Sequence, residues 1–218
     1  QKTVECSPKK SDEYGNEKCR NNCRNRGGDM IHAHDPCHPG NCKKGTYFLA
    51  DTLINRHPNT ETLIDIARLA NHTVRFFNHK PVTAMLSYSN FGTDTTGSPA
   101  AVHEAVNYLH REYPEWDIDG EMQVNIALDK ELRDKKYPFS RLNGMEVNTL
   151  IFPCLNTANT TYKMLQALTT DVEIIGPIQM GLNKPVHFID FESTVEDIVN
   201  VTAIASIDAM VSKNVGNE

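Results

Sequence analysis

The feature that most constrains the fold is an alternation of short apolar runs with amphipathic segments, which starts at Gly45 and continues to about Met210. Runs of four to seven mostly apolar residues are typical of buried strands. They occur at Thr46–Ala50, Val82–Tyr88, Asn148–Phe152 and Val172–Ile175. Strands that alternate with helices predict an α/β fold, with a mostly parallel sheet in a three-layer α/β/α arrangement.

Helix-start signals separate these runs. Asn59 or Thr60 can cap a first helix, in which apolar side chains recur at steps of three and four from Leu63. Ser98 followed by Pro99 predicts the start of a second helix. The sequence further predicts a helix over Thr157–Leu168, and a capping box at Ser193-x-x-Glu196 before a long apolar helix that reaches about Met210.

Residues 1–44 differ in composition from the rest. They hold five of the six cysteines and three of the nine histidines, and nine Lys/Arg against six Asp/Glu give them a net charge of +3. Their only large apolar side chains are Val4, Tyr14, Met30 and Ile31. This is too little apolar surface to offset the entropy of ordering the backbone. We therefore expect a poorly structured, irregular leader over 1–44 and a domain over 45–212.

Metal or disulfide bonds could stabilise that leader. Two cysteine pairs lie near the spacing of zinc ligands, namely Cys19 with Cys23 and Cys37 with Cys42. Four thiolates, or three with an imidazole, suit Zn²⁺. The spacing is loose, however, and matches no finger pattern. Three interpretations stay open: a metal site, a disulfide framework, and a leader that has neither.

The charge of the whole chain is −6, which argues against binding to the phosphate backbone of nucleic acids. No stretch approaches the roughly 18 consecutive apolar residues that a membrane span needs. We therefore expect a cytoplasmic protein with neither nucleic acid nor a membrane as its partner.

Three polar loops follow predicted strand ends: Ser87–Gly92, Pro153–Asn159 and Gly176–Gly181. In open α/β sheets the ligand crevice lies beyond the carboxyl ends of the strands. The loops are rich in amides, hydroxyls or glycine, and helix N-termini nearby favour anions. Any one of them alone can be an ordinary capped turn. Together they predict a cleft for a phosphate-bearing or acyl ligand.

Several segments in the right order resemble the phosphate acetyl/butyryltransferase family, over about Lys44 to Met210. The form of SYSNFG, GEMQVN and GPIQMGLNKPVH is closer to the C-terminal domain of bacterial NADP-dependent malic enzymes than to free-standing phosphotransacetylases. The matching segments are Ala84–Gly92 (AMLSYSNFG), Ile118–Leu128 (IDGEMQVNIAL), Thr149–Lys163 (TLIFPCLNTANTTYK), Glu173–His187 (EIIGPIQMGLNKPVH) and Ser193–Ala209 (STVEDIVNVTAIASIDA).

The resemblance implies an isocitrate/isopropylmalate dehydrogenase-like fold. In the malic enzymes the domain follows a catalytic malic domain, which uses NADP and a divalent metal. It is understood to bind acetyl-CoA as an allosteric inhibitor and to help build the oligomer. The present chain contains no G-x-G-x-x-G dinucleotide fingerprint, and its leader stands where the family has a first lobe. The resemblance thus implies a partial regulatory domain, a fragment with acetyl-CoA or a related acyl-CoA as effector, no cofactor of its own, and a homo-oligomeric parent.

One departure from the family bears on catalysis. Phosphotransacetylases carry Ser-Arg-Gly immediately before the final capped helix, where the serine and arginine serve the thiol and the acyl phosphate. Aligned on the shared Val195–Val199, these positions hold Asp190, Phe191 and Glu192. A phenylalanine cannot supply the bidentate cation, and carboxylates repel an acyl phosphate. The resemblance therefore implies no catalytic residue in this chain, and leaves the retained Asp197 as a helix-dipole partner. An active phosphate acetyltransferase, which converts acetyl-CoA and phosphate to acetyl phosphate and CoA, is the alternative.

By analogy with the family's loops, polar side chains would line the acyl end of a CoA site, and two lysines are the nearest cations for its phosphates. We expect Ser87, Asn90, Asn156, Asn159 and Gln179 to share one pocket, with Asp190 and Phe191 beside it. The full set of candidate ligand-binding residues is Ser87, Ser89, Asn90, Asn156, Asn159, Lys163, Gln179, Gly181 and Lys184.

The remaining reactive side chains have simpler interpretations. Cys154 is a lone cysteine without an evident base, so we expect it to pack. Asp119 and Glu121 flank Gly120 in a turn-like position that indicates no acid–base role. The mixed charges of Asp129–Lys136 are typical of a solvated helix face. No metal-ligand spacing relates the histidines beyond the leader, which are His57, His72, His79, His103, His110 and His187.

Overall fold

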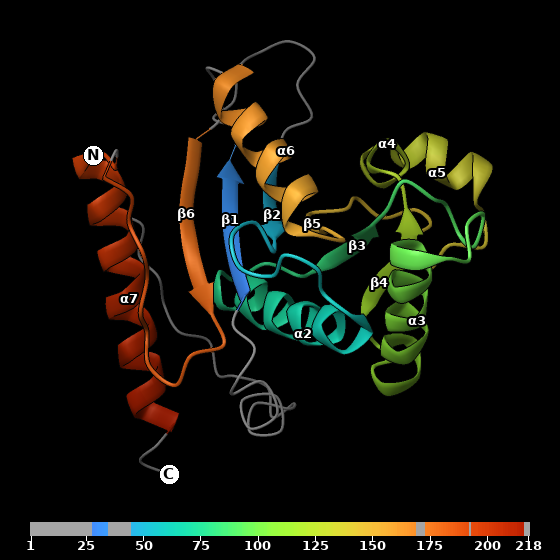
Figure 1. Cartoon of the computed structure of the whole chain (residues 1–218). Helices are drawn as coiled ribbons and strands as arrows, with labels where there is room; N and C mark the ends of the chain where they lie inside the picture. The colour runs from blue at the N-terminus through green and yellow to red at the C-terminus, as the bar shows by residue number, and fades with distance from the viewer. Residues whose placement is uncertain (1–27, 35–44, 169–172, 192, 216–218) are drawn as a thin grey trace.

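A six-stranded sheet in the order β4-β3-β5-β2-β1-β6 organises the protein (Figure 1). The computed structural model describes residues 28–34, 45–168, 173–191 and 193–215. β2, β5, β3 and β4 are parallel, whereas β1 is antiparallel to both β2 and β6. The predicted α/β class with a mostly parallel sheet is confirmed. The strands are β1 (Gly28–His34), β2 (Thr46–Ala50), β3 (Val82–Leu86), β4 (Asp117–Met122), β5 (Thr149–Ile151) and β6 (Glu173–Met180).

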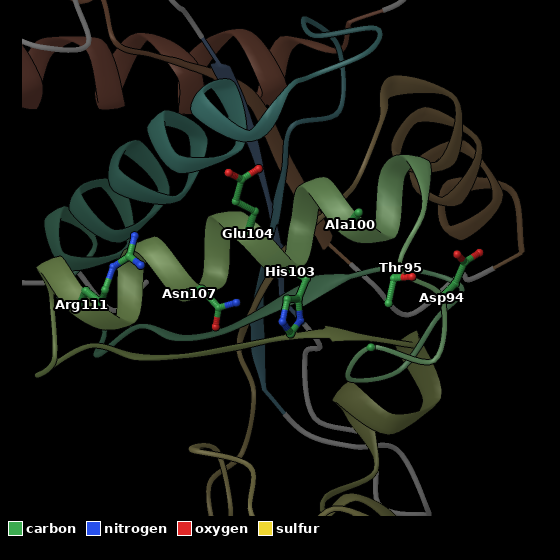
Figure 2. A pocket seen from close by; sticks show the side chains of 8 residues that line it. Asp94, Thr95, Ala100, His103, Glu104, Asn107 and Arg111 are labelled. Atoms are coloured by element: carbon green, nitrogen blue, oxygen red, sulfur yellow. The ribbon is translucent and has the colours of Figure 1, made fainter.

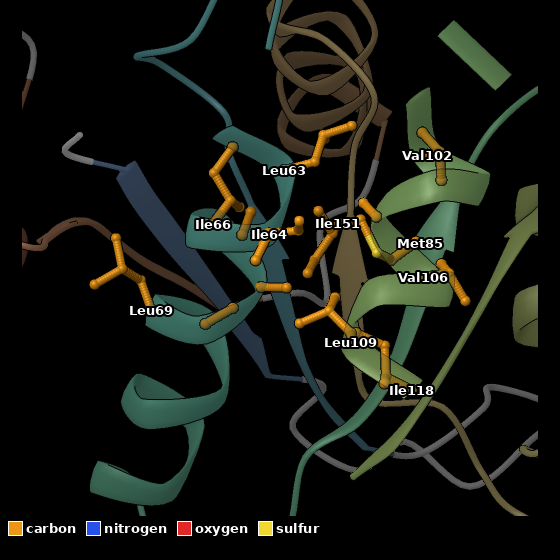
Figure 3. Packing of buried hydrophobic residues seen from close by; sticks show 14 of the residues in the cluster. Leu63, Ile64, Ile66, Leu69, Met85, Val102, Val106, Leu109, Ile118 and Ile151 are labelled. Atoms are coloured by element: carbon orange, nitrogen blue, oxygen red, sulfur yellow. The ribbon is translucent and has the colours of Figure 1, made fainter. Parts of the chain in front are cut away.

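Two apolar cores cover the two faces of the sheet, because successive side chains of a strand point to opposite faces. In β2, Phe48 and Ala50 belong to the first core and Leu49 to the second. The first core (Figure 3) is covered by α2 (Thr60–Phe76) and α3 (Gly97–Glu112). α4 (Val124–Leu128) and α6 (Leu155–Leu168) contribute to the second core, and α7 (Val195–Val215) packs against β6. No helix in the described part of the chain has the length and apolar character needed to cross a membrane.

The capping signals of the sequence are confirmed in part. Asn59 caps α2, and its side chain accepts a hydrogen bond from the backbone N–H of Thr62 at 2.9 Å. The second helix begins two residues earlier than its Ser-Pro signal predicted, and Thr96 occupies the N-cap position without a side-chain cap bond. The capping box of α7 is shifted by one residue. Thr194 and Asp197 form it reciprocally, at 3.2 Å and 2.8 Å.

Three strands differ from the expectations, and one of them is β4, which the sequence patterns did not predict. The strand expected to end at Ile175 continues through Pro177 to Met180. β6 lies at the edge of the sheet, where a proline needs no partner for its missing N–H. Within the segment expected to be an irregular leader, residues 28–34 form β1 between β2 and β6. Strand pairing uses backbone groups, so an apolar-poor composition does not forbid it. The other leader residues lie outside the described ones, including Cys19, Cys23, Cys37 and Cys42.

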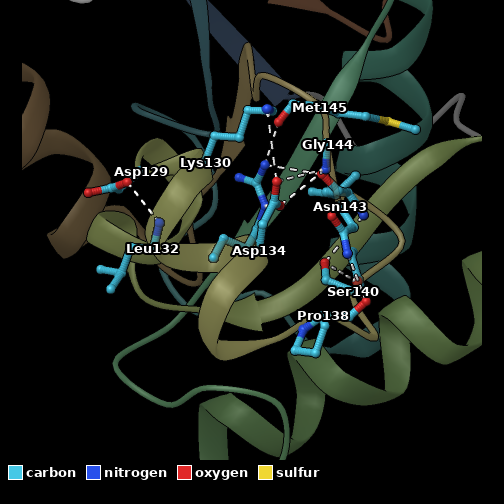
Figure 4. A network of polar contacts seen from close by, with 12 residues as sticks. Asp129, Lys130, Leu132, Asp134, Pro138, Ser140, Asn143, Gly144 and Met145 are labelled. Atoms are coloured by element: carbon cyan, nitrogen blue, oxygen red, sulfur yellow. Dashed lines mark hydrogen bonds and ion pairs between the residues drawn. The ribbon is translucent and has the colours of Figure 1, made fainter.

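The mixed-charge segment is not wholly solvated. It forms α5 (Lys130–Lys136), capped by Asp129, but Arg133 is completely buried. Its guanidinium donates to the carbonyl oxygens of Ala127 at 2.8 Å and Leu142 at 3.1 Å, and to that of Met145. Figure 4 shows the surrounding polar contacts, in which Asp134 of α5 accepts the Gly144 N–H of the turn before β5. A solvated face therefore describes the other charges of the helix but not Arg133.

Candidate functional site

The three polar segments singled out in the sequence lie at one edge of the sheet. The strand registers pair one residue of each strand with its neighbours, which gives a row of residues across the sheet. The strands end within a few residues of this row. The row consists of Gly120, Met85, Ile151, Ala50, Met30 and Ile178. This edge carries the carboxyl ends of β4, β3, β5, β2 and β6. It is the edge at which α/β sheets bind ligands.

The segment Ser87–Gly92, called here the ligand loop, follows β3 and is tied down by its own hydroxyl and amide groups. Ser89 is 3% exposed, and its hydroxyl bonds to the Glu121 carboxylate at 3.0 Å. The Asn90 amide oxygen accepts the Gln123 N–H at 2.9 Å. The Ser87 hydroxyl accepts the Ser89 N–H at 3.2 Å. The predicted residues of this loop therefore hold its shape as well as lying at the sheet edge.

Glu121, which sequence reasoning set aside, is the anchor of the ligand loop. It lies inside β4 rather than in a turn, and its side chain is 0% exposed. Oε1 accepts the Gly92 N–H at 2.6 Å, and Oε2 lies 3.1 Å from His103 Nδ1. The turn-like interpretation of Asp119 and Glu121 is thus wrong. The alternation of Ile118 and Met122 with polar residues was the available signal for a strand.

The loop continues into an exposed hydrogen-bonded turn. The Tyr88 hydroxyl donates to Asp94 at 2.7 Å, and the other oxygen of Asp94 accepts the backbone N–H of Thr96. The bond from Tyr88 is the largest influence that lowers the pKa of Asp94 below its usual value. The same bond raises the pKa of Tyr88. Both shifts favour a charged carboxylate facing a neutral phenol.

The second polar segment begins α6, after β5. Asn156 is exposed, whereas Asn159 directs its amide N–H to the Thr52 carbonyl oxygen at 3.4 Å and so contacts the segment after β2. Cys154 is a free thiol, half-buried, with its sulfur 3.5 Å from the Thr157 hydroxyl. Lys163 is exposed, and its ammonium lies 5.0 Å from the ring centre of Tyr162.

The third segment belongs to β6, which is four strands away from β3 and its ligand loop along the same edge of the sheet. The backbone N–H of Gln179 donates to His187 Nδ1 at 3.1 Å, and burial lowers the pKa of His187. Gly181 has a φ of +80°, a conformation that favours glycine, and Lys184 is exposed. With strands ~4.8 Å apart, the four steps from β3 to β6 separate Ser87 from Gln179 by about 19 Å. The candidate residues therefore share an edge of the sheet across a wide span.

Asp190 and Phe191 lie in the exposed turn before α7. The backbone N–H of Phe191 donates to the Asp190 carboxylate at 2.7 Å, and the Phe191 side chain is fully exposed. Asp197 uses its carboxylate to cap α7, bonding the Thr194 N–H and hydroxyl at 2.8 Å each. In this structure all three residues serve the turn and the helix start.

A groove of about 360 Å³ runs along α3, beside the ligand loop (Figure 2). We call it the α3 groove. None of the predicted ligand residues lines it, although Gly92 of the ligand loop does. Within the described residues, no group of three or more His, Cys, Asp or Glu could hold a metal ion. The lining residues are Gly92, Asp94, Thr95, Ala100, His103, Glu104, Asn107 and Arg111.

Comparison with known proteins adds to this geometry. Residues 37–206 match the family model described as phosphate acetyl/butaryl transferase. The NADP-dependent malic enzyme of Salmonella typhimurium is 36% identical over 165 residues, which are 76% of this chain and 22% of that protein. The phosphate acetyltransferase of Nitratidesulfovibrio vulgaris is 39% identical over 171 residues, 78% of this chain and 24% of that protein. The chain thus spans about a quarter or less of the length of these curated relatives.

A solved structure agrees with this family match. A phosphotransacetylase from Streptococcus pyogenes superposes with a TM-score of 0.75 at 31% sequence identity. The match covers 85% of this chain and 54% of that one.

Proposed function

Since the chain belongs to the phosphate acetyl/butaryl transferase family, we propose that it binds acetyl-CoA or a related acyl-CoA without transferring the acyl group. Its phosphotransacetylase-like domain would then be the regulatory part of an NADP-dependent malic enzyme. The observation that carries this proposal is the turn before α7. Asp190 and Phe191 stand where the resemblance implies a catalytic serine and arginine. Asp190 is engaged in the turn itself, which supports a structural use of this segment.

The residues at the sheet edge suit binding better than chemistry. Acyl-CoA combines an acyl and pantetheine part, which needs amide and hydroxyl partners, with phosphates, which need cations. In the proposal, the ligand loop and Asn156 contact the acyl part, and the exposed Lys163 and Lys184 offer cations for the phosphates. The wide span between the ligand loop and Gln179 fits an elongated ligand better than a small one.

The parent enzyme would supply what this chain lacks. NADP and a divalent metal would bind to a catalytic malic domain outside the present sequence, and a cytoplasmic location fits that role. We further propose a homo-oligomer. Exposed apolar side chains on α7 and on the segment before it, including Phe188, Ile189, Val195 and Val199, support the presence of a covering partner.

The proposal is tested by titrating the chain with acetyl-CoA in a calorimeter and by assaying acetyl phosphate formation with acetyl-CoA and phosphate. We expect saturable binding without turnover. Turnover in the usual range of enzymes, roughly 1–1,000 per second, would instead establish an active phosphate acetyltransferase. That alternative is favoured by relatives that carry this name, such as the protein of Nitratidesulfovibrio vulgaris. Absence of binding would refute both.

A further inference from the structure

Glu121 is a carboxylate with no exposure to solvent, and this burial needs compensation. Removing a carboxylate from water costs several kcal/mol unless hydrogen bonds replace the lost hydration. Three donors do so: the Gly92 N–H at 2.6 Å, the Ser89 hydroxyl at 3.0 Å and the His103 ring at 3.1 Å. Two of the three belong to the ligand loop. The conformation of this loop is therefore tied to the carboxylate.

His103 is the third partner of Glu121, and it belongs to α3 rather than to the ligand loop. Its ring reaches from α3 to β4 and is 48% exposed, on the wall of the α3 groove. An ionised Glu121 only accepts hydrogen bonds, so Nδ1 of His103 is assigned as the donor in this pair. His103 thus holds Glu121 from the surface while Glu121 holds the ligand loop. Figure 2 shows His103 on the α3 face beside Asn107 and near the loop that carries Thr95.

Asp119 is a natural comparison for Glu121. It lies two residues earlier in β4 and is 6% exposed. Its carboxylate accepts the Ser140 hydroxyl at 2.7 Å and the Arg141 N–H at 2.8 Å, and it lies 3.7 Å from His110. These two buried carboxylates of β4 thus each lie near a histidine of α3. One secures the turn after α5, and the other secures the ligand loop.

We propose that Glu121 and His103 are positioning residues for acyl-CoA binding. Glu121 sets the geometry of the ligand loop from β4, and His103 supports Glu121 from α3. The inference rests on the proposed function, since it assumes that the ligand loop contacts the acyl-CoA. Neither residue touches the ligand. Both act through Ser89 and Gly92.

Glu121→Gln is the test variant, and Asp119→Asn is its matched control. An amide in place of Glu121 removes the negative charge and turns one of the two acceptor oxygens into an NH₂ donor, which weakens the hydrogen bonds that hold the loop and His103. Both variants remove one buried carboxylate from the same strand, so both should lower the thermal unfolding midpoint. We expect Glu121→Gln to weaken acetyl-CoA binding about tenfold or more, and Asp119→Asn to leave the affinity within about twofold. Equal affinity losses in the two variants would overturn the proposal.

A second pair of variants separates positioning from packing. His103→Gln keeps an N–H donor for Glu121, whereas His103→Leu removes it. We expect the glutamine variant to retain most of the affinity and the leucine variant to lose it. The same affinity in both would count against a role for His103.

A readout that needs no ligand distinguishes this inference from the proposed function. Hydrogen exchange at the Gly92 amide should speed up in Glu121→Gln and stay unchanged in Asp119→Asn. If the unaltered chain failed to bind acetyl-CoA while this difference appeared, the proposed function would be wrong but Glu121 would still position the loop. An unchanged Gly92 amide in Glu121→Gln would refute the positioning role itself.

Discussion

At the scale of single residues, Arg133 is a fully buried cation that donates to backbone carbonyl oxygens of the segments around α5. Replacing it with methionine fills much of the same space but leaves these carbonyls without their donor. We expect Arg133→Met to lower the free energy of unfolding by about 2–4 kcal/mol, since each buried carbonyl left unsatisfied costs about 1–3 kcal/mol.

Chemical denaturation with urea measures this change. Arg141→Met is the control, because Arg141 is exposed and only its backbone N–H bonds to Asp119. A loss in Arg133→Met no larger than in the control would show that the turn before β5 is held by other contacts.

Arg133 and Glu121 show that sequence patterns miss buried charged residues whose partners are distant in the chain. Both were assigned to solvated or turn positions because charged residues are mostly exposed. Glu121 bonds to partners 29 and 32 residues earlier, and such pairing depends on strand order rather than on local spacing. By contrast Asn59 and its bond to Thr62 follow from a local signal, and this cap was predictable.

At the scale of elements, the alternation of strands and helices was predictable, because burial on both faces of a parallel sheet imposes apolar runs such as Val82–Leu86. β1 was not, since its pairing depends on the free edges of β2 and β6. The location of the three polar segments at one sheet edge follows from parallel topology. Their spread across the sheet depends on strand order, which periodicity does not encode.

His187 links β6 to the segment that leads into α7, and this link predicts a pH dependence. Nδ1 accepts the Gln179 N–H, which only a neutral ring can do. Burial lowers the pKa of His187 from its ordinary value of 6.5, and Asp208 opposes this without reversing it. The unfolded chain therefore binds the proton more readily. The contribution of His187 to stability is present above pH 6.5 and is lost as the pH falls through the folded-state pKa.

Thermal unfolding midpoints measured from pH 8 to pH 5 test this expectation. The unaltered chain should lose stability on acidification relative to His187→Gln, whose amide oxygen still accepts from Gln179 but does not titrate. His57→Gln, a change in an exposed loop, should follow the unaltered chain. Parallel curves for the unaltered chain and His187→Gln would contradict the role given to the imidazole.

At the scale of the whole molecule, α7 leaves an apolar surface uncovered. In the described part of the helix, Val201 is buried, whereas Val195, Val199 and Met210 are 79%, 59% and 65% exposed. A helix that is apolar around its circumference is typical of a buried position. In Figure 1 it lies outside β6, far from α3. Such a surface marks an interaction site rather than a solvated face.

The proposed homo-oligomer predicts that this surface holds copies of the chain together. We expect sedimentation velocity to show dimers or larger species for the unaltered chain, and monomers for Val199→Glu combined with Met210→Glu. Glutamate keeps helix propensity while it places charge on the apolar surface. Thr202→Glu adds one such charge at an exposed polar position of α7 and should leave the oligomer intact. A monomeric unaltered chain would contradict the proposed homo-oligomer.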